Sequence, residues 1–161
     1  MLASEAPQVS ERDDAARPHK PVIPPDMKAF NRALVEEWRA NNGRLSGRMA
    51  GRNLILLTTT GARSGEPRTV VLSFGRHGGN IVAIASNNGA ASHPAWYRNL
   101  LRRPTATVEL GPDRFAVRAR TARPEERAAL AKVVPYLESQ QQLTEREIPI
   151  VVLERVETSP R

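Results

Sequence analysis

The chain is 161 residues long and carries 24 lysines and arginines against 17 aspartates and glutamates, which gives a formal net charge of +7 at pH 7. This length supports one domain with a core of its own. The sequence has no cysteine and three histidines, so disulfides, thiol catalysis, iron–sulfur clusters and cysteine-based zinc sites are excluded, and we predict no metal site. No apolar run reaches the roughly 20 residues of a membrane-spanning helix. The positive charge fits an anionic partner, although an arginine-rich composition or solubility alone also explains it.

The chain begins with a segment that predicts no regular structure. Residues 1–25 mix charges with clustered prolines and predict a disordered, proline-rich tail. This tail lacks the apolar centre of a secretory signal, so we expect a cytoplasmic protein, with peripheral contact at the inner face of the membrane left open. Residues 26–157 are expected to form a single domain, and residues 158–161 a second short tail.

The first half of this domain predicts a helix followed by three strands and a second helix. A helix from about residue 26 to residue 42 is indicated by the spacing of Phe30, Leu34, Val35 and Trp38. Apolar, β-branched runs predict strands at residues 53–60, 66–74 and 80–86, the last two joined as a hairpin. The next helix opens at Ser92-His93-Pro94 and ends before Pro104.

The second half predicts another hairpin, a helix and a closing strand. The hairpin strands are expected at residues 105–110 and 114–121, the helix at 124–141 with a kink before Pro135, and the last strand at 148–156. The total is about six strands and three helices, with the strands joined mostly as antiparallel hairpins. This order favours an α+β or mainly β fold, such as a small barrel, over a dinucleotide-binding βαβ fold.

The loop between the first two strands has the composition of an anion site. It reads Thr58-Thr59-Thr60-Gly61-Ala62-Arg63-Ser64-Gly65-Glu66-Pro67-Arg68. Two glycines four residues apart let backbone N–H groups converge, and the two arginines favour a phosphate. The lysine of a P-loop is absent, and the serine lies one place too late for a nucleophile elbow. A polar hairpin loop with solvated arginines is the alternative.

Two further segments lie around the start of the second helix. Ala85-Ser86-Asn87-Asn88-Gly89 follows a strand and precedes this helix, where unpaired amides favour anions, although an ordinary strand–turn–helix joint has the same composition. In His93-Pro94-Ala95-Trp96-Tyr97-Arg98-Asn99, the two aromatic residues either wall a planar ligand or belong to the core. No nucleophile or general base emerges elsewhere, so an enzyme with this sequence would depend on a cofactor.

Taken in chain order, these segments resemble one family. The resemblance is carried by Leu56-Leu57-Thr58-Thr59-Thr60-Gly61, Ser64-Gly65-x-Pro67-Arg68, Ala85-Ser86-x-x-Gly89, His93-Pro94-x-Trp96-Tyr97-x-Asn99-Leu100 and Ile148-Pro149-Ile150-Val151-Val152. Over about residues 27–156 the chain is similar to the deazaflavin-dependent nitroreductases, small reductases that use coenzyme F-420. The resemblance implies a split β-barrel like that of the FMN-binding pyridoxamine-phosphate-oxidase group. It also implies hydride transfer from reduced coenzyme F-420 to a quinone, an activated enone or a nitroaromatic compound.

The resemblance further implies roles for individual residues. The phosphate and acidic tail of the coenzyme would be held by Arg63, Ser64, Gly65, Pro67 and Arg68. The deazaflavin ring would be lined by Ala85, Ser86 and Asn87, and Ser86 is the candidate catalytic residue that polarises the acceptor's oxygen. Trp96 and Asn99 would close the site from the helix, while Tyr136 and Leu137 lie in the stretch that covers the substrate in the prototype nitroreductase.

Some positions depart from the family pattern. Ala62 and Asn87 stand where relatives often carry basic residues, which leaves affinity for a long acidic tail open. Only Tyr136 is aromatic in a stretch that carries several tyrosines in the prototype, so reduction of nitro compounds does not follow.

Other classes of function remain as alternatives. The same barrel could hold FMN or haem, because one fold hosts several cofactors. A basic nucleic-acid-binding module is a third interpretation, but the aromatic residues are few for base stacking and the arginines are spread along the whole chain. We therefore expect a small-molecule electron acceptor as partner, no nucleic acid, and a monomer or a homodimer.

Overall fold

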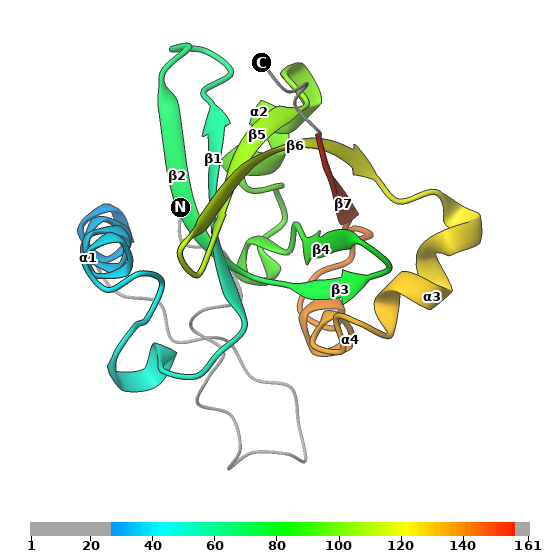
Figure 1. The fold of residues 1–161 in the computed structure, drawn as a ribbon. Coiled ribbons are helices and arrows are strands. Elements are labelled where there is room, and N and C mark those ends of the chain that lie inside the picture. The colour runs from blue at the N-terminus through cyan, green and yellow to red at the C-terminus, as the bar shows by residue number, and fades with distance from the viewer. Residues whose placement is uncertain (1–26, 157–161) are drawn as a thin grey trace.

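The computed structural model describes residues 27–156 (Figure 1). The predicted tails, residues 1–25 and 158–161, lie outside the described residues, so the predicted limits of the domain stay a prediction. The helices are α1 (Met27–Ala40), α2 (Ala95–Arg102), α3 (Arg127–Ala131) and α4 (Leu137–Gln141), with the short 3-10 turns η2 (Gly47–Met49), η3 (Asn87–Gly89) and η4 (Pro124–Glu126). The strands are β1 (Leu54–Thr60), β2 (Pro67–Ser73), β3 (Gly75–His77), β4 (Asn80–Ile84), β5 (Thr105–Leu110), β6 (Asp113–Thr121) and β7 (Ile150–Arg155).

The seven strands form one sheet in the order β2-β1-β5-β6-β7-β4-β3, in which every neighbouring pair is antiparallel. The two edge strands, β2 and β3, are neighbours in the chain, because only Phe74 separates them. A sheet whose opposite edges are joined by one residue has to curl, and Figure 1 shows the resulting half-barrel. The predicted mainly β, barrel-like fold is confirmed.

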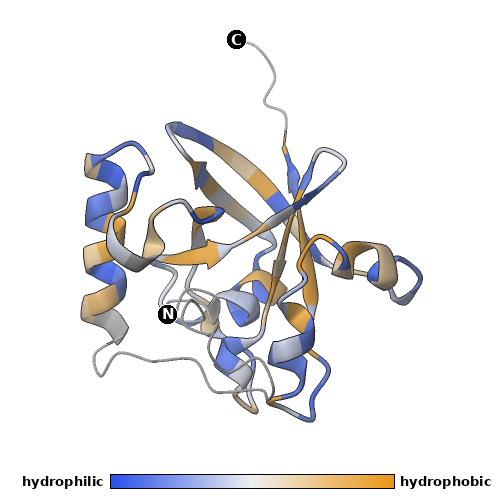
Figure 2. Cartoon of the chain, turned by 90° about the horizontal axis from the view of Figure 1, so that it is seen from below, coloured by the Kyte–Doolittle hydropathy of each residue, from blue (hydrophilic) through white to orange (hydrophobic). Residues whose placement is uncertain are grey.

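Several strands are buried on both faces, which explains their unbroken apolar runs. In β1, Ile55 and Leu57 belong to the core inside the half-barrel, whereas Leu54 and Leu56 belong to a second cluster beneath α1. A third cluster joins β4 and β7 to the α3–α4 region through Val82, Ile84, Leu130, Val134, Leu137, Ile148, Ile150 and Val152. Figure 2 shows the apolar residues gathered along the strands and the hydrophilic ones at their ends.

Two helices position the ends of the β1–β2 hairpin. α1 packs on the outer cluster through Leu34 and Trp38, and the Asn31 side chain donates a hydrogen bond of 2.7 Å to the carbonyl oxygen of Thr69 in β2. α2 packs against β1 and inserts its apolar face into the inner core, because Trp96, Tyr97 and Leu100 are all buried there. The loop between β1 and β2 therefore lies beside α2.

The structure differs from the predicted elements at three places. The predicted hairpin between the strands at 66–74 and 80–86 does not form, because β2 pairs with β1, whereas β4 pairs with β3 and β7. The predicted strand at 66–74 ends at Ser73, and β3 starts separately at Gly75, because the backbone passes so close to Val133 that a Cβ at Gly75 would lie 2.0 Å from its carbonyl oxygen. The predicted helix at 124–141 is divided into α3 and α4, because Pro135 has no N–H and disfavours a helical residue before it. The chain thus has seven strands and four α-helices among its described residues.

Candidate functional site

The loop from Gly61 to Glu66 is a tight turn that depends on glycine. The amide of Gly61 donates to the carbonyl oxygen of Glu66 at 2.8 Å, and the amide of Gly65 donates to that of Gly61 at 2.9 Å. A Cβ at Gly61 would lie 2.6 Å from Ser64 Oγ, and Gly65 has a φ of +74° that favours glycine. The amides of Arg63 and Ser64 bond to no residue that the structure describes, so these two donors remain for a ligand.

Asn99 of α2 holds this loop in place. Its Oδ1 atom accepts a hydrogen bond of 2.9 Å from the Ala62 amide, and its Nδ2 atom donates one of 3.0 Å to Thr59 Oγ1. Asn99 is 6% exposed and Thr59 is 1% exposed, so the bond between these two side chains is shielded from water, whereas the bond from the Ala62 amide is partly buried. Sequence comparison predicted Asn99 as a contact to the coenzyme. The structure shows a positioning role, because Asn99 fixes the loop to α2, and its contact to the coenzyme stays a prediction.

Between the loop and α2 lies a cavity of about 620 Å³, which we call the arginine cavity. It is lined by Gly61, Ala62, Arg63, Ser64, Arg68, Val70, Ala95, Trp96, Arg98, Asn99, Leu101 and Arg102. Four of these residues are arginines and none is acidic, so the cavity favours an anion. Its apolar side includes Leu101, a large hydrophobic side chain that is 62% exposed. A ligand with an anionic and an apolar part fits this combination.

Two of the four arginines were not predicted as site residues. Arg98 and Arg102 come from α2, four residues apart, and therefore lie on one face of the helix. That spacing was the available signal. In the sequence it does not stand out, because arginines occur along the whole chain.

The turn after β4 is the second part of the candidate site, and a single arginine holds it. Arg146 Nη2 donates to the carbonyl oxygens of Ala85 and Ser86 at 3.1 and 2.9 Å, and its Nε donates to that of Ala90 at 2.9 Å. Its Nη1 lies 3.0 Å from His93 Nδ1. Within the described chain, Arg146 forms no ion pair with a carboxylate, and burial lowers the pKa of its guanidinium. A partly buried positive charge thus lies beneath this turn.

His93 connects the turn to the arginine cavity. Burial lowers its pKa below the ordinary value, and the positive charges of Arg146 and Arg98 lower it further. A guanidinium only donates, so the neutral ring accepts at Nδ1 and carries its proton at Nε2. Arg98, which lines the arginine cavity, donates to the His93 carbonyl oxygen at 2.9 Å. A continuous series of contacts therefore runs from the cavity to the turn.

The structure brings some predicted site residues together and separates others. Arg63, Ser64, Arg68, Trp96 and Asn99 line the arginine cavity, and Gly65 and Pro67 belong to the same hairpin end. Ala85 and Ser86 do not line it, and both have 0% of their surface exposed. A bound acceptor reaches the Ser86 hydroxyl only if the turn shifts. Asn87 is half-buried, and its side chain donates to the Ser92 carbonyl oxygen at 3.0 Å.

Tyr136 and Leu137, the predicted substrate-pocket residues, do not line the arginine cavity. Leu137 is 8% exposed and belongs to the core cluster under α3 and α4, and Tyr136 packs against the same cluster. Helix α4 does pack against η3, which follows Ser86. These two residues therefore belong to the region beside η3 and not to the lining of the arginine cavity.

The fold defines the class: the curled antiparallel sheet is a split β-barrel, and it carries a cavity lined by four arginines and no acidic residue. The family model described as F420H(2)-dependent quinone reductase matches residues 30–155, so the chain belongs to this family. An F420H(2)-dependent quinone reductase from Mycobacterium tuberculosis is 36% identical over 126 residues, which cover 73% of this chain and 85% of the relative.

Solved structures agree with this assignment. A structure of an F420-H2 dependent reductase (FDR-A) has a TM-score of 0.57 and 34% sequence identity, and the match covers 64% of this chain and 95% of that chain. A structure described as a domain-swapped dimer has a TM-score of 0.60 and 29% identity, covering 80% of this chain and 100% of the other. The predicted membership of the deazaflavin-dependent reductases and the predicted split β-barrel are confirmed.

Proposed function

We propose that this chain takes hydride from reduced coenzyme F-420 and passes it to a small electron-poor acceptor, with quinones as the first class to test. Family membership supports the coenzyme and the reaction type. The observation that carries the proposal is the arginine cavity, where four arginines and no acidic residue surround a glycine-dependent loop. Coenzyme F-420 carries a phosphate and a glutamate tail, so its charge is opposite to that of the cavity.

The residues of the arginine cavity fit such a coenzyme. The Arg63 and Ser64 amides and the guanidinium groups of Arg63 and Arg68 supply donors for a phosphate. Trp96 Nε1 is buried at the same cavity and bonds to no described residue, which leaves one further donor. When bound, the reduced coenzyme supplies a hydride from C5 of its deazaflavin ring. Because this hydride passes directly between two rings, the protein's own part is placement and electrostatics.

Arg98 and Arg102 are the residues that we propose for holding an acidic tail. The family resemblance implies basic residues at the positions of Ala62 and Asn87, and this chain has none there. The α2 arginines line the same cavity and restore two positive charges from the opposite wall. We therefore place the acidic tail along α2, next to Arg98 and Arg102.

Ser86 and its turn are the proposed place of the ring. Arg146 donates to the backbone carbonyl oxygens of Ala85 and Ser86, and these bonds stabilise a turn that contains two asparagines with positive φ, Asn87 at 51° and Asn88 at 56°. The partly buried charge of Arg146 also favours a negatively charged ring nearby. We keep Ser86 as the candidate that polarises the acceptor oxygen, which requires the turn to open.

Location and assembly are separate questions. No helix among the described residues is long and apolar enough to cross a membrane. A relative's structure is described as a domain-swapped dimer, which makes a homodimer one candidate for this chain beside the monomer. We propose a cytoplasmic enzyme that meets its acceptor in solution, and sedimentation with lipid vesicles tests the alternative of peripheral membrane contact.

The proposal is tested by following the oxidation of reduced coenzyme F-420 with menadione as acceptor. The expected result is turnover that depends on the protein and returns the long-wavelength absorbance of the oxidised deazaflavin. The double variant Arg63→Gln/Arg68→Gln should raise KM for the coenzyme and change the KM for menadione little. Protein that is yellow as purified and releases FMN on denaturation, without activity with coenzyme F-420, would overturn the proposal in favour of the FMN alternative.

A further inference from the structure

One side chain, that of Gln141, spans the loop between α4 and β7. This loop comprises residues 142–149 and contains no helix or strand. The Nε2 atom of Gln141 donates hydrogen bonds to the carbonyl oxygens of Thr144 and Arg146, at 3.4 and 2.6 Å. Its Oε1 atom accepts a hydrogen bond of 2.9 Å from the amide of Ile148. The side-chain amide of Gln141 therefore bonds to the backbone before Arg146, at Arg146 and after it.

These bonds fix the backbone from which the Arg146 side chain reaches the turn after β4. Its guanidinium donates to three backbone carbonyl oxygens within residues 85–90 and lies 3.0 Å from His93 Nδ1. A long arginine side chain loses rotamer freedom when it is held in one place. A backbone that already directs the side chain toward the turn lowers this cost. Gln141 and Arg146 thus form one series of hydrogen bonds from α4 to the turn.

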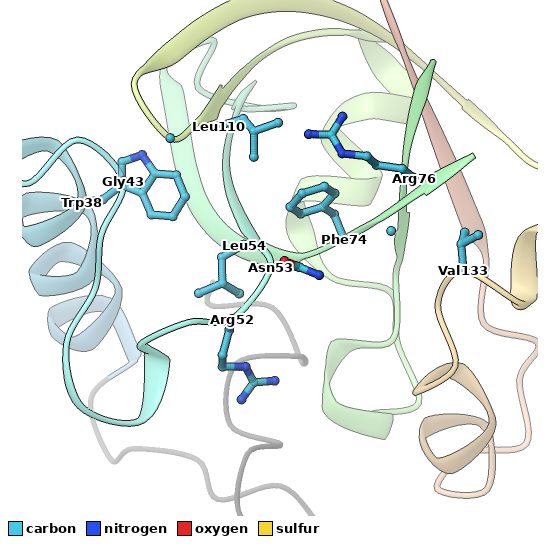
Figure 3. Close-up of a pocket in the computed structure, with 11 residues that line it drawn as sticks. Trp38, Gly43, Arg52, Asn53, Leu54, Phe74, Arg76, Leu110 and Val133 are labelled. Atoms are coloured by element: carbon cyan, nitrogen blue, oxygen red, sulfur yellow. The ribbon is translucent and has the colours of Figure 1, made fainter. Parts of the chain in front are cut away.

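The end of α4 also packs directly against the turn. Gly89 lies so close to Leu143 that a side chain at this glycine would clash with the leucine, and α4 itself contacts η3. The segment before α4 is anchored as well. Figure 3 shows Val133 beside the β3 strand that carries Arg76, and the Val133 carbonyl oxygen leaves no room for a Cβ at Gly75. The α4 region is therefore fixed to the sheet on one side and to the turn on the other.

The turn itself has a backbone that needs such support. Asn87 and Asn88 both have positive φ, and consecutive residues other than glycine in this region are uncommon. The amides of Gly89 and Ala90 donate to the carbonyl oxygens of Ser86 and Asn87, each at 3.0 Å. These two bonds lie within the turn and do not tie it to the rest of the fold. The bonds from the loop between α4 and β7 do so.

We propose that Gln141 is a positioning residue of the reductase, which acts through Arg146 to place the turn beside the coenzyme ring. This inference rests on the proposed function, because the turn after β4 is the proposed place of the ring. Gln141 does not line the arginine cavity, so the binding of the phosphate and the acidic tail does not depend on it. Hydride transfer between two rings is sensitive to small errors in their placement. Gln141 therefore contributes to kcat and little to KM.

The test compares Gln141→Met with Gln142→Met in the oxidation of reduced coenzyme F-420 by menadione. Methionine is unbranched like glutamine and lacks the amide that makes the three hydrogen bonds. Gln142 is the matched control, because it is exposed and its side chain bonds to no residue that the structure describes. We expect Gln141→Met to lower kcat at least about tenfold and to keep KM for the coenzyme within about threefold. Gln142→Met should keep both within about twofold.

A second measurement follows Arg146 in the absence of coenzyme. Burial, and after it the positive charge of Arg146, lowers the pKa of His93. Release of the Arg146 side chain would weaken this effect. Gln141→Met should therefore raise the pKa of His93 in an NMR titration, in the same direction as Arg146→Met, whereas Gln142→Met should leave it at the wild-type value.

A second variant covers the case in which Gln141→Met does not fold. Gln141→Glu keeps an acceptor for the Ile148 amide and loses the donor to the Arg146 carbonyl oxygen, so it should also lower kcat with little change in KM. An unchanged or raised kcat in the folded variants, an equal loss in Gln142→Met, a higher KM without a loss in kcat, or an unchanged pKa of His93 would overturn the proposal. A wild-type protein that neither binds nor oxidises reduced coenzyme F-420 would overturn the proposed function and this role with it. An active wild-type protein with an equally active Gln141→Met refutes the role of Gln141 alone.

Discussion

The hydrogen bonds of Asn99 provide a test of how the coenzyme loop is held. Asn99→Ala removes the bond of 2.9 Å from the Ala62 amide and the bond of 3.0 Å to Thr59 Oγ1. Two neutral bonds, each worth about 1 kcal/mol, are lost, and the buried Thr59 hydroxyl loses its partner, so the free energy of unfolding should fall by about 2–3 kcal/mol. For a domain of this size that corresponds to a decrease in Tm of about 10 °C.

Asn99→Ala should weaken the binding of coenzyme F-420 by more than the loss of stability alone would cause. Without Asn99, the Ala62 amide no longer holds the loop against α2, so we expect the Kd for coenzyme F-420 to rise about tenfold in a fluorescence titration well below Tm. Thr59→Val is the matched control, because it removes the partner of Nδ2 and leaves the bond from Ala62 intact. It should lower stability by about 1–2 kcal/mol and keep the Kd within about twofold.

The two variants together decide the interpretation. If Asn99→Ala binds the coenzyme as tightly as the wild-type protein, the loop does not depend on α2. If Thr59→Val weakens binding as much as Asn99→Ala, the loss follows from general destabilisation, and the positioning role of Asn99 is refuted.

Three further predictions concern other charged residues. Arg102→Gln should weaken the binding of coenzyme F-420 several-fold and make it less sensitive to salt, whereas Arg118→Gln on the exposed face of β6 should change neither quantity in a titration at two ionic strengths. Arg146→Met removes the positive charge that helps to lower the pKa of His93, so an NMR titration should show this pKa rising toward its ordinary value. The hydrogen bond from the Arg120 guanidinium, and to a smaller extent the one from the Arg123 backbone amide, lower the pKa of Glu126 from 4.5 to about 2. Ionised Glu126 therefore stabilises the fold above about pH 4.5, and this contribution disappears as the pH falls toward 2. Glu126→Gln should therefore flatten the acid side of a plot of Tm against pH, and an unchanged slope would contradict this assignment.

Much of the fold could be predicted because the strands are local patterns. The run Leu54–Leu57 is apolar on both faces, and the structure buries it between the inner core and α1. The break at Phe74 was not predictable, since it depends on Val133, which approaches Gly75 from far along the chain. A sequence pattern does not contain that contact.

The same distinction applies to the candidate site. The loop around Gly61–Gly65 was predicted because glycines and arginines occur together within one hairpin. Arg146 was missed, because its partners Ala85, Ser86 and Ala90 are backbone carbonyls 56–61 residues earlier in the chain. A carbonyl oxygen leaves no signature in the sequence, so only the fold shows which arginine it binds.

We propose the arginine cavity as the coenzyme site, and an equilibrium titration tests this assignment most directly. Deazaflavin fluorescence should change in a saturable way when wild-type protein is added to coenzyme F-420, with FMN at the same concentration failing to compete. Arg63→Gln/Arg68→Gln should give the circular dichroism spectrum of the wild-type protein and bind the coenzyme at least about tenfold more weakly. Equal affinity of the double variant, or displacement of the coenzyme by FMN, would contradict the claim.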